Sequence, residues 1–260
     1  MFIAPLGGPS RTAEPTRRSE GLVPTTAEAL LDQRFHEEVT SLYDQHAHSF
    51  EELLSALQYR TPQELEKSLL AQLESISPHG DGVLSRTVCL DLGCGTGLVG
   101  SLLRRRCTGQ LSGCDLSGEM LKIAEAKAGI YDALTKSECV SFLRQAAPAS
   151  ADLIIACDVI VYMHGLTELF AAAAAALSPG GKLAFSTEVC GLDEVSGGLP
   201  PSGPGWIERE SERVAHATEY IRWLVERHAQ ELTLYSLRES TIRMDGGQDV
   251  KGSIVVLVKV

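Results

Sequence analysis

The feature that most constrains this chain of 260 residues is a cluster of glycines between an apolar run and an expected helix. Residues 87–92 (TVCLDL) predict a buried strand, and glycines follow it at positions 93, 95, 97 and 100. We expect a helix from residue 97 to about residue 106. Glycine lets the backbone approach a ligand closely, and a helix N-terminus favours negative groups. The segment therefore predicts a ligand-binding turn at the end of a buried strand.

Short apolar runs alternate with helical segments along the chain that follows. Further strands are expected at residues 110–115, 138–142, 152–157 and 182–186, with helices at 117–124 and 166–177. This alternation with short connections predicts an α/β fold with a parallel, doubly wound sheet. Two last strands, 232–244 and 252–260, flank Asp245-Gly246-Gly247, which suits a hairpin turn. The hairpin requires one antiparallel strand in the sheet.

The first third of the chain has a different pattern. Residues 1–25 are rich in Gly, Pro, Ser and Arg, and we expect them to be a disordered extension. Residues 27–57 carry apolar side chains at helical spacings of three and four. A second helix is expected to begin at Thr61, with Pro62 in its first turn and Glu64 completing a capping box.

Charge and apolar content exclude several kinds of partner. The chain has 23 Lys and Arg against 34 Asp and Glu, which gives a formal net charge of −11. Phosphate backbones and anionic lipids repel such a chain, so a broad nucleic-acid or membrane surface is not expected. The longest apolar stretch, residues 169–177, is far shorter than the roughly 20 residues that a membrane-spanning helix needs.

The seven cysteines indicate a compartment rather than a site. None of their spacings matches a zinc-ligand or CxxC pattern, so no metal site is predicted. Several lie in apolar runs, which is typical of buried free thiols in a reducing compartment, and we expect a cytoplasmic protein. Arg11, Arg17 and Arg18 give a weak organelle-targeting signal, against which Glu14 and Glu20 argue.

Two registers of the glycine cluster compete. In the first, Gly95-x-Gly97-x-x-Gly100 matches the dinucleotide-binding fingerprint, but the preceding strand would then contain an acid and a glycine. In the second, Asp91 stands two residues before Gly93 and gives acid-x-Gly-x-Gly-x-Gly. Asp115, at the end of the next strand, could accept two hydrogen bonds from a ribose diol in either case.

The second register resembles motif I of the class I methyltransferases, which bind S-adenosylmethionine. Residues 114–121 (CDLSGEML), 151–159 (ADLIIACDV) and 177–183 (LSPGGKL) resemble later motifs of that family in the same order. The resemblance covers roughly residues 85–260. It implies a mostly parallel, seven-stranded Rossmann-like sheet with an antiparallel C-terminal hairpin strand and N-terminal helices.

The same resemblance implies where the cofactor S-adenosylmethionine binds. Asp91 would hold loop amides or reach the ligand's amino group, Leu116 and Met120 would flank the adenine, and the N-terminal helices would cover the site. In many members an Asp ends the third strand, and here Glu138 is the nearest acid. The implied domains are the tail (1–25), a helical lid (26–84) and the methyltransferase domain (85–260). The implied cofactor-binding residues are Tyr43, Tyr59, Asp91, Gly93, Cys94, Gly95, Gly97, Asp115, Leu116, Met120, Glu138, Cys139 and Asp158.

A narrower resemblance involves short motifs scattered along the chain. They lie at residues 43–50 (YDQHAHSF), 57–62 (LQYRTP), 129–134 (GIYDAL) and 215–220 (AHATEY). These segments are similar to a subgroup of predicted methyltransferases that in bacteria often follow tetratricopeptide repeats. The subgroup has a vertebrate relative from the Williams–Beuren chromosomal region.

The chemistry implied by the resemblance needs few catalytic groups. A sulfonium methyl group is already activated, so the protein mainly holds the acceptor in line, and a general base is needed only for a weakly nucleophilic, protonated acceptor. Asp158 and His216 are the candidate catalytic residues. Tyr162, His164 and His216 are candidate substrate contacts, together with the Gly/Pro/Ser-rich loop at 190–205.

The acceptor class follows from two observations. The motif Asn-Pro-Pro-Tyr, typical of enzymes that methylate amino groups of nucleic acids, is absent after the fourth strand, where residues 157–160 are CDVI. The acidic charge balance also argues against nucleic acid, so we expect a small-molecule or protein acceptor. Two alternatives stay open: a non-catalytic S-adenosylmethionine-binding protein or partner subunit, and an NAD-dependent oxidoreductase.

Overall fold

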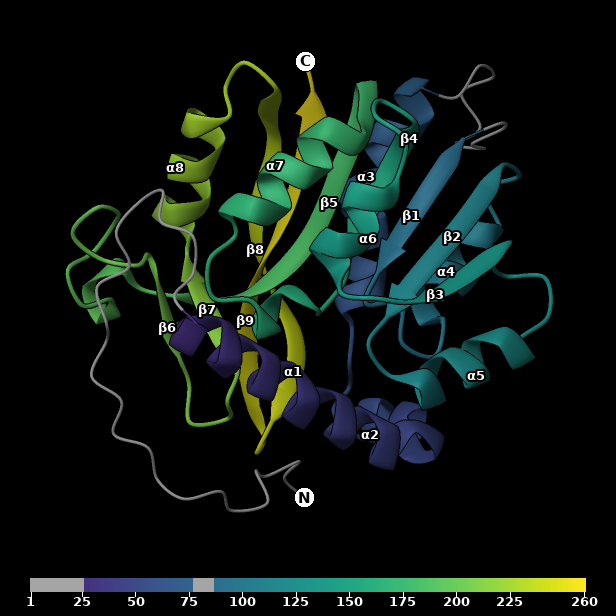
Figure 1. Ribbon diagram of the computed structural model, residues 1–260, viewed down its shortest axis with the longest axis horizontal. Helices are drawn as coiled ribbons and strands as arrows, with labels where there is room; N and C mark the ends of the chain where they lie inside the picture. Colours follow the sequence, from purple (N-terminus) through teal and green to yellow (C-terminus); the bar gives the residue numbers. More distant parts are fainter. Residues whose placement is uncertain (1–25, 77–86) are drawn as a thin grey trace.

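One sheet organises the computed structural model, which describes residues 26–76 and 87–260 (Figure 1). The predicted N-terminal tail, residues 1–25, lies outside the described residues. The strands are β1 (Val88–Leu92), β2 (Gln110–Asp115), β3 (Ala133–Lys136), β4 (Ala151–Ala156), β5 (Leu177–Cys190), β6 (Trp206–Glu208), β7 (Val214–Ala217), β8 (Leu232–Asp245) and β9 (Gln248–Lys259). The α-helices are α1 (Thr26–His46), α2 (Phe50–Ala56), α3 (Thr61–Ile76), α4 (Leu98–Arg104), α5 (Gly118–Ala126), α6 (Cys139–Gln145), α7 (Thr167–Ala176) and α8 (Thr218–Arg227).

The strand order confirms the predicted fold class. Strands β3, β2, β1, β4 and β5 are parallel neighbours in that order. Strand β9 then pairs antiparallel with β5 on one side and with β8 on the other. These seven strands form the expected mostly parallel sheet with its antiparallel C-terminal hairpin. The pair β6–β7 is an addition that the sequence did not predict, and it joins the sheet where β7 runs parallel to residues 188–190 of β5.

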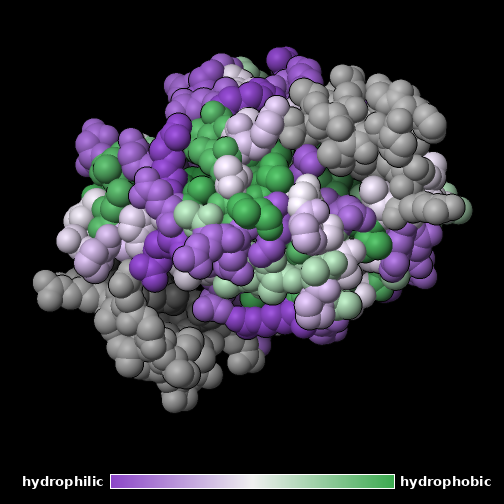
Figure 2. Space-filling view, turned by 90° about the horizontal axis from the view of Figure 1, so that it is seen from above, coloured by the Kyte–Doolittle hydropathy of each residue, from purple (hydrophilic) through white to green (hydrophobic). Residues whose placement is uncertain are grey.

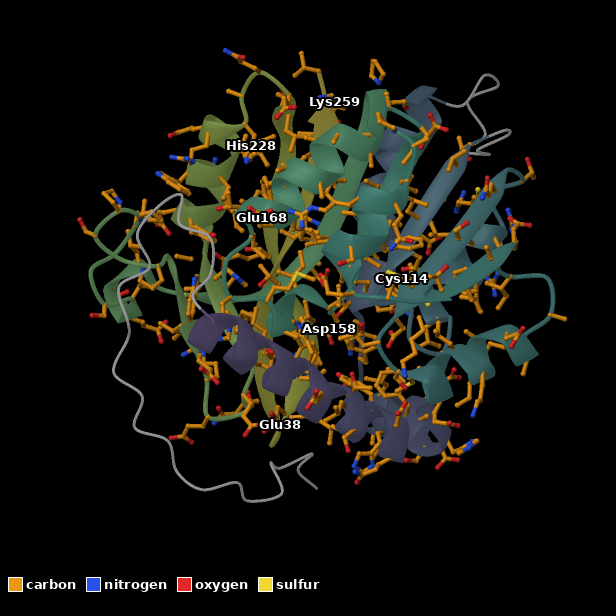
Figure 3. All side chains as sticks on the ribbon, viewed as in Figure 1. Glu38, Cys114, Asp158, Glu168, His228 and Lys259 are labelled. Carbon is orange, nitrogen blue, oxygen red and sulfur yellow. The ribbon has the colours of Figure 1, made fainter. Side chains whose placement is uncertain are left out.

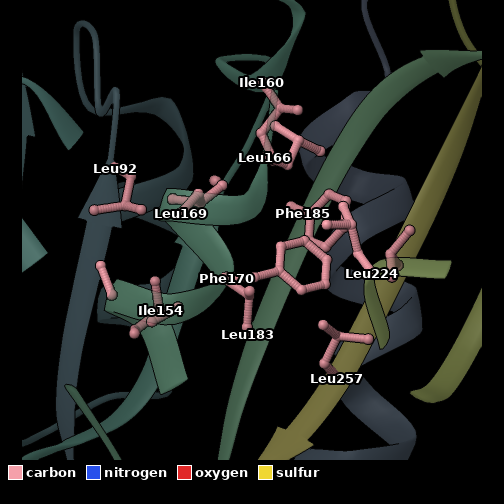
Figure 4. Close-up of a cluster of buried hydrophobic side chains, with 14 of the residues drawn as sticks. Leu92, Ile154, Ile160, Leu166, Leu169, Phe170, Leu183, Phe185, Leu224 and Leu257 are labelled. Atoms are coloured by element: carbon pink, nitrogen blue, oxygen red, sulfur yellow. The ribbon is translucent and has the colours of Figure 1, made fainter. Parts of the chain in front are cut away.

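Helices cover both faces of the sheet, as a doubly wound fold requires. Helices α6, α7 and α8 cover one face, where Phe170 and Leu224 pack with Phe185 and Leu257 of the sheet (Figure 4). On the other face, Leu65 and Leu69 of α3 and Leu103 of α4 pack against buried sheet residues such as Ile254. Helix α3 therefore belongs to the layer that covers the sheet, whereas α1 and α2 lie past the carboxyl ends of the strands (Figure 1).

Two local predictions were wrong. Residues 138–142 are not a strand, because Glu138 caps α6 with its carboxylate, and the third strand is β3, five residues earlier. The capping box of α3 is also absent. The Thr61 hydroxyl donates to the Ile242 carbonyl instead, at 3.3 Å, and the Glu64 carboxylate binds Arg238 at 2.9 Å. Both polar groups thus fasten α3 to the C-terminal hairpin.

No helix among the described residues is long and apolar enough to cross a membrane. Seen from above, hydrophobic residues lie in the middle of the visible face and hydrophilic residues border them (Figure 2).

Candidate active site

A cavity of about 140 Å³ lies between the helices α1 and α2 and the carboxyl ends of β1, β2 and β4. Ligands of open α/β sheets bind at this edge. Most of the residues singled out in the sequence line it. They are Tyr43, Tyr59, Gly93, Cys94, Gly95, Asp115, Leu116, Met120, Glu138, Cys139, Asp158 and Tyr162. Figure 3 shows Asp158 between the sheet and α1.

The glycine turn has the conformation that its sequence demands. Gly93, Gly95 and Gly97 have φ values of 61°, 53° and 87°, in the left-handed region that favours glycine. A Cβ on Gly93 would lie 2.5 Å from a methyl group of Val159, whereas a Cβ on Gly95 would meet only Phe50, at 3.9 Å. Gly93 is therefore needed for packing, and Gly95 leaves the turn open toward the cavity.

Asp115 joins the end of β2 to this turn. Its Oδ2 accepts a hydrogen bond from the Gly95 amide at 2.9 Å, and its Oδ1 accepts one from the Ser117 amide at 2.8 Å. Burial raises the pKa of Asp115, although these amide bonds oppose the shift. An ionised carboxylate can accept about four hydrogen bonds, so Asp115 has capacity left for a ligand.

Two predicted cofactor contacts lie outside the lining of the cavity. Asp91 is only 1% exposed and accepts a hydrogen bond from the Tyr131 hydroxyl at 2.6 Å. Burial raises the pKa of Asp91 to about 7. Gly97 packs against Tyr131 as well, since a Cβ there would lie 3.1 Å from its ring. Asp91 and Gly97 thus support the turn from behind.

Glu138 lines the cavity, but its carboxylate is engaged at the start of α6. Its two oxygens accept hydrogen bonds from the amides of Val140, at 2.7 Å, and Ser141, at 2.8 Å. The neighbouring Cys139 lines the cavity too, as do Leu116 and Met120. The cavity thus combines apolar side chains with two acids, Glu138 and Asp115, whose geometry the backbone fixes.

Polar contacts hold α1 and α2 over the sheet edge. Asp44 accepts hydrogen bonds from the Ser117 hydroxyl at 2.5 Å and the Glu119 amide at 3.2 Å. Glu51 accepts one from the Thr96 hydroxyl at 2.6 Å, and its carboxylate also pairs with Lys127. Both helices are therefore tied to the loops that carry the glycine turn and Asp115.

Three tyrosines, Tyr43, Tyr59 and Tyr162, also line the cavity. The hydroxyls of Tyr43 and Tyr162 share a hydrogen bond of 2.5 Å, and the Tyr59 hydroxyl lies 3.6 Å from the Cys157 sulfur. Burial raises the pKa of both Tyr43 and Tyr59 well above the usual value, so these phenols stay protonated at neutral pH.

Asp158 has an unusual environment. Its backbone is left-handed, with a φ of 57°, and its amide donates to the Ser186 hydroxyl at 2.8 Å. Its Oδ2 lies 3.5 Å from Arg213, and its Oδ1 lies 4.0 Å from Arg243. The Oδ1 atom is buried and has no hydrogen-bond partner among the described residues. Arg243 Nη1, 4.0 Å away, is likewise buried without a hydrogen-bond partner among the described residues, so the two atoms form a long ion pair. Asp158 also lines the cavity.

The two candidate histidines lie elsewhere, contrary to the expectation that they contact substrate. His216 is fully buried on β7, with Nδ1 2.7 Å from the Thr187 hydroxyl and Nε2 3.0 Å from the His164 carbonyl. Because a carbonyl only accepts, Nε2 carries the hydrogen. Burial lowers the pKa of His216 to about 4, so the ring is neutral near pH 7. The His164 ring packs against Trp206, at 4.6 Å between centroids.

Sequence reasoning missed Arg213, which lines the cavity beside Asp158. It directly precedes β7, in a segment without apolar periodicity, so no local signal marked it. Phe50 and Thr96 were also missed, although both flank predicted elements of the site.

Comparison with known proteins finds similarity to methyltransferases. Residues 90–183 match the family model of a methyltransferase domain. The chain is 33% identical over 125 residues to the ubiquinone biosynthesis O-methyltransferase of Idiomarina loihiensis, a match that covers 47% of this chain and 51% of that protein. The chain spans about half the length of the curated relatives it matches.

Solved structures extend the similarity to the whole fold. The 1,6-didemethyltoxoflavin-N1-methyltransferase of Burkholderia thailandensis, with bound 1,6-didemethyltoxoflavin and S-adenosylhomocysteine, superposes with a TM-score of 0.62 at 14% identity and covers 93% of each chain. Magnesium protoporphyrin IX methyltransferase of Synechocystis PCC 6803, with bound S-adenosylmethionine, gives a TM-score of 0.51 at 17% identity and covers 76% of this chain and 79% of its own. The chain has the Rossmann-like fold of these methyltransferases.

Proposed function

We propose that the chain is a methyltransferase that uses S-adenosylmethionine to methylate a small-molecule or protein acceptor. The main supporting observation is the hydrogen bond between Gly95 and Asp115, which brings the glycine turn and a half-buried carboxylate together in one cavity. The methyltransferase-domain match covers this junction. When bound, the donor supplies an activated methyl group for direct displacement.

The residues at this end of the cavity fit such a donor. Gly95 leaves space above the turn, and Asp115 retains acceptor capacity for the two hydroxyls of a ribose. Leu116 and Met120 offer apolar contacts for an adenine, and Glu138 and Cys139 line the same cavity. Tyr43 and Tyr59 cover the cavity from the lid side, so the lid excludes water from the reacting atoms.

Asp158 is the residue that we propose to touch the acceptor. Its carboxylate lines the cavity and would accept a hydrogen bond from an O–H or N–H group of the acceptor and take up its proton. Tyr162 forms the neighbouring wall. His216 is a positioning residue, because its ring holds the His164 carbonyl beside β7.

The resemblance to the subgroup and the cellular compartment are also part of the proposal. The subgroup motifs supply Asp44, which binds Ser117, and Tyr131, which binds Asp91, so these motif residues support the site. Seven buried free cysteines support a reducing compartment such as the cytoplasm. We propose residues 85–260 as the catalytic domain and α1 and α2, from the predicted 26–84 segment, as its lid.

Calorimetric titration with S-adenosylmethionine, S-adenosylhomocysteine and NAD tests the proposal. We expect both sulfur compounds to bind and NAD to give no heat. Binding of NAD alone would favour an oxidoreductase and end the methyltransferase proposal. A screen of metabolite fractions for release of S-adenosylhomocysteine tests catalysis, and donor binding without turnover on any fraction would favour a non-catalytic binding protein.

A further inference from the structure

Arg213 lines the cavity, and only part of its guanidinium group is engaged by other residues. Its Nη1 lies 3.5 Å from Asp158 and 3.5 Å from Glu188, and its guanidinium stacks over the Tyr162 ring at 5.5 Å. Charge-assisted hydrogen bonds between a guanidinium and a carboxylate are normally about 2.7–2.9 Å long. Among the described residues, Nε and Nη2 of Arg213 have no hydrogen-bond acceptor.

Arg238 shows how this chain treats an arginine that is purely structural. Its Nε, Nη1 and Nη2 donate to the Ser68 hydroxyl, the Glu64 carboxylate and the Glu64 carbonyl, at distances from 2.6 to 2.9 Å. Arg243 lies between these cases, since its Nη2 binds Glu188 at 2.5 Å. Arg213 is the member of this set that lines the cavity.

The added strand pair β6–β7 holds Arg213 in place. Strand β7 pairs with the end of β5, His216 of β7 binds Thr187, and the Cys190 sulfur donates to the Ala215 carbonyl at 3.3 Å. The turn before β7 is closed by a hydrogen bond of 2.8 Å between the Arg209 amide and the Arg213 carbonyl. These contacts fix the backbone that carries Arg213, which indicates that the position of the Arg213 side chain matters for a ligand.

We propose that Arg213 binds an oxyanion of the methyl acceptor, either a carboxylate or a phosphate, through Nε and Nη2. This inference rests on the proposed function. The planar fork of a guanidinium matches such oxyanions through two parallel hydrogen bonds. The two carboxylates of Asp158 and Glu188 balance the two guanidinium charges of Arg213 and Arg243. An anionic acceptor would then be balanced by the positive charge of the sulfonium donor. The acceptor is thus an acidic molecule whose reacting group faces Asp158.

Thermal unfolding of the full chain saturated with S-adenosylhomocysteine tests this inference at constant ionic strength. The probes are benzoate and phenyl phosphate, with benzamide and benzyl alcohol as neutral counterparts. We expect one of the two anions to raise Tm by about 2 °C and the neutral probes to have no effect, because binding to the native state stabilises it. The anion that acts distinguishes a carboxylate from a phosphate.

Variants assign the effect to Arg213. Arg213→Gln should abolish the rise, while Arg222→Gln, which removes the same charge from the exposed face of α8, should keep it. Arg213→Lys keeps the positive charge but lacks the planar guanidinium, and it serves as the test variant if Arg213→Gln does not fold. We expect it to reduce the anion-induced rise in Tm by at least half.

Three outcomes would overturn the inference: no anion acts, benzamide acts equally, or Arg213→Gln retains the effect. Weaker S-adenosylhomocysteine binding by Arg213→Gln would also overturn it, because Arg213 would then belong to the donor site. Failure of the wild-type chain to bind S-adenosylhomocysteine would instead contradict the proposed function.

Discussion

The two proposed ends of the cavity are built in different ways. At the proposed donor end, with Gly95, Asp115 and Glu138, each carboxylate binds backbone amides. At the proposed acceptor end, with Asp158, Tyr162 and Arg213, polar side chains contact one another and the Tyr43 hydroxyl, and one carboxylate oxygen has no hydrogen-bond partner among the described residues.

The difference indicates how substitutions at each end should act. Backbone amides stay in place when side chains are substituted, so the donor end suits a ligand that never varies. Side-chain contacts are lost one at a time, so the acceptor end can be altered without disturbing the sheet. Substitutions at the two ends should therefore have different effects on stability and on donor binding.

The largest effect is expected where the two ends meet, at Gly93. Gly93→Ala should lower the free energy of unfolding by about 4 kcal/mol, because it adds left-handed backbone strain and a clash with the stiff, branched Val159. Chemical denaturation measures the loss. Gly180→Ala is the control, since Gly180 has a φ of 79° but nothing within 4 Å of an added Cβ, and it should cost only about 1 kcal/mol. Equal losses in the two variants would show that Gly93 has no packing role.

The acid behind the donor end should make stability depend on pH. Because the folded chain holds Asp91 with a pKa of about 7, and the unfolded chain has an ordinary value near 3.9, the folded state keeps the proton longer. The contribution of Asp91 to the free energy of unfolding is therefore lost as pH rises from about 4 to 7. Relative to Asp91→Asn, the wild type should lose roughly 3 kcal/mol between pH 5 and 8. If the difference in the free energy of unfolding between the wild type and Asp91→Asn were the same at pH 5 and pH 8, a buried Asp91 with a raised pKa would be contradicted.

Asp115 should matter for the affinity of the donor. Asp115→Ala should weaken S-adenosylhomocysteine binding by about 2 kcal/mol, because two hydrogen bonds to the ribose are lost. Calorimetry measures this, with Asp249→Ala on the exposed C-terminal hairpin as the control. An unchanged affinity would remove Asp115 from the donor site.

The smallest effect is expected at the acceptor end. Tyr43→Phe removes one hydrogen bond to Tyr162 and should lower the free energy of unfolding by about 1 kcal/mol, without changing S-adenosylhomocysteine affinity. Tyr235→Phe at an exposed position should cost nothing measurable. If Tyr43→Phe weakened donor binding as much as Asp115→Ala, the separation of the two ends would be wrong.

The same contrast decides what the sequence could predict. The donor end is encoded in short consecutive segments, because a glycine turn and the acid ending the next strand meet wherever two parallel strands pair. Local patterns are therefore enough to place residues 93–95 and 115–120 at this edge of the sheet. The contact expected between Asp91 and the ligand is absent from the cavity lining, since Asp91 binds Tyr131 from a distant loop instead.

The acceptor end depends on long-range packing that local patterns do not contain. Arg213 reaches the cavity because β7 pairs with β5, and β6 and β7, with only 3 and 4 residues, are too short to give a periodic pattern. The sequence favours His216 because it lies in one of the motifs of the narrower resemblance, but in the structure both of its ring nitrogens are engaged on β7. Residues 138–142 (ECVSF) form a short, partly apolar run that resembles a strand, whereas the carboxylate of Glu138 caps the helix that begins there.

A crystal structure of the chain with S-adenosylhomocysteine would show whether the cavity is divided into a donor end and an acceptor end. We expect ribose hydroxyls within hydrogen-bond distance of Asp115, the adenine beside Leu116 and Met120, and the sulfur facing the space between Asp158 and Tyr162. A ligand seated against Arg213 with Asp115 untouched, or bound outside the cavity, would contradict this division.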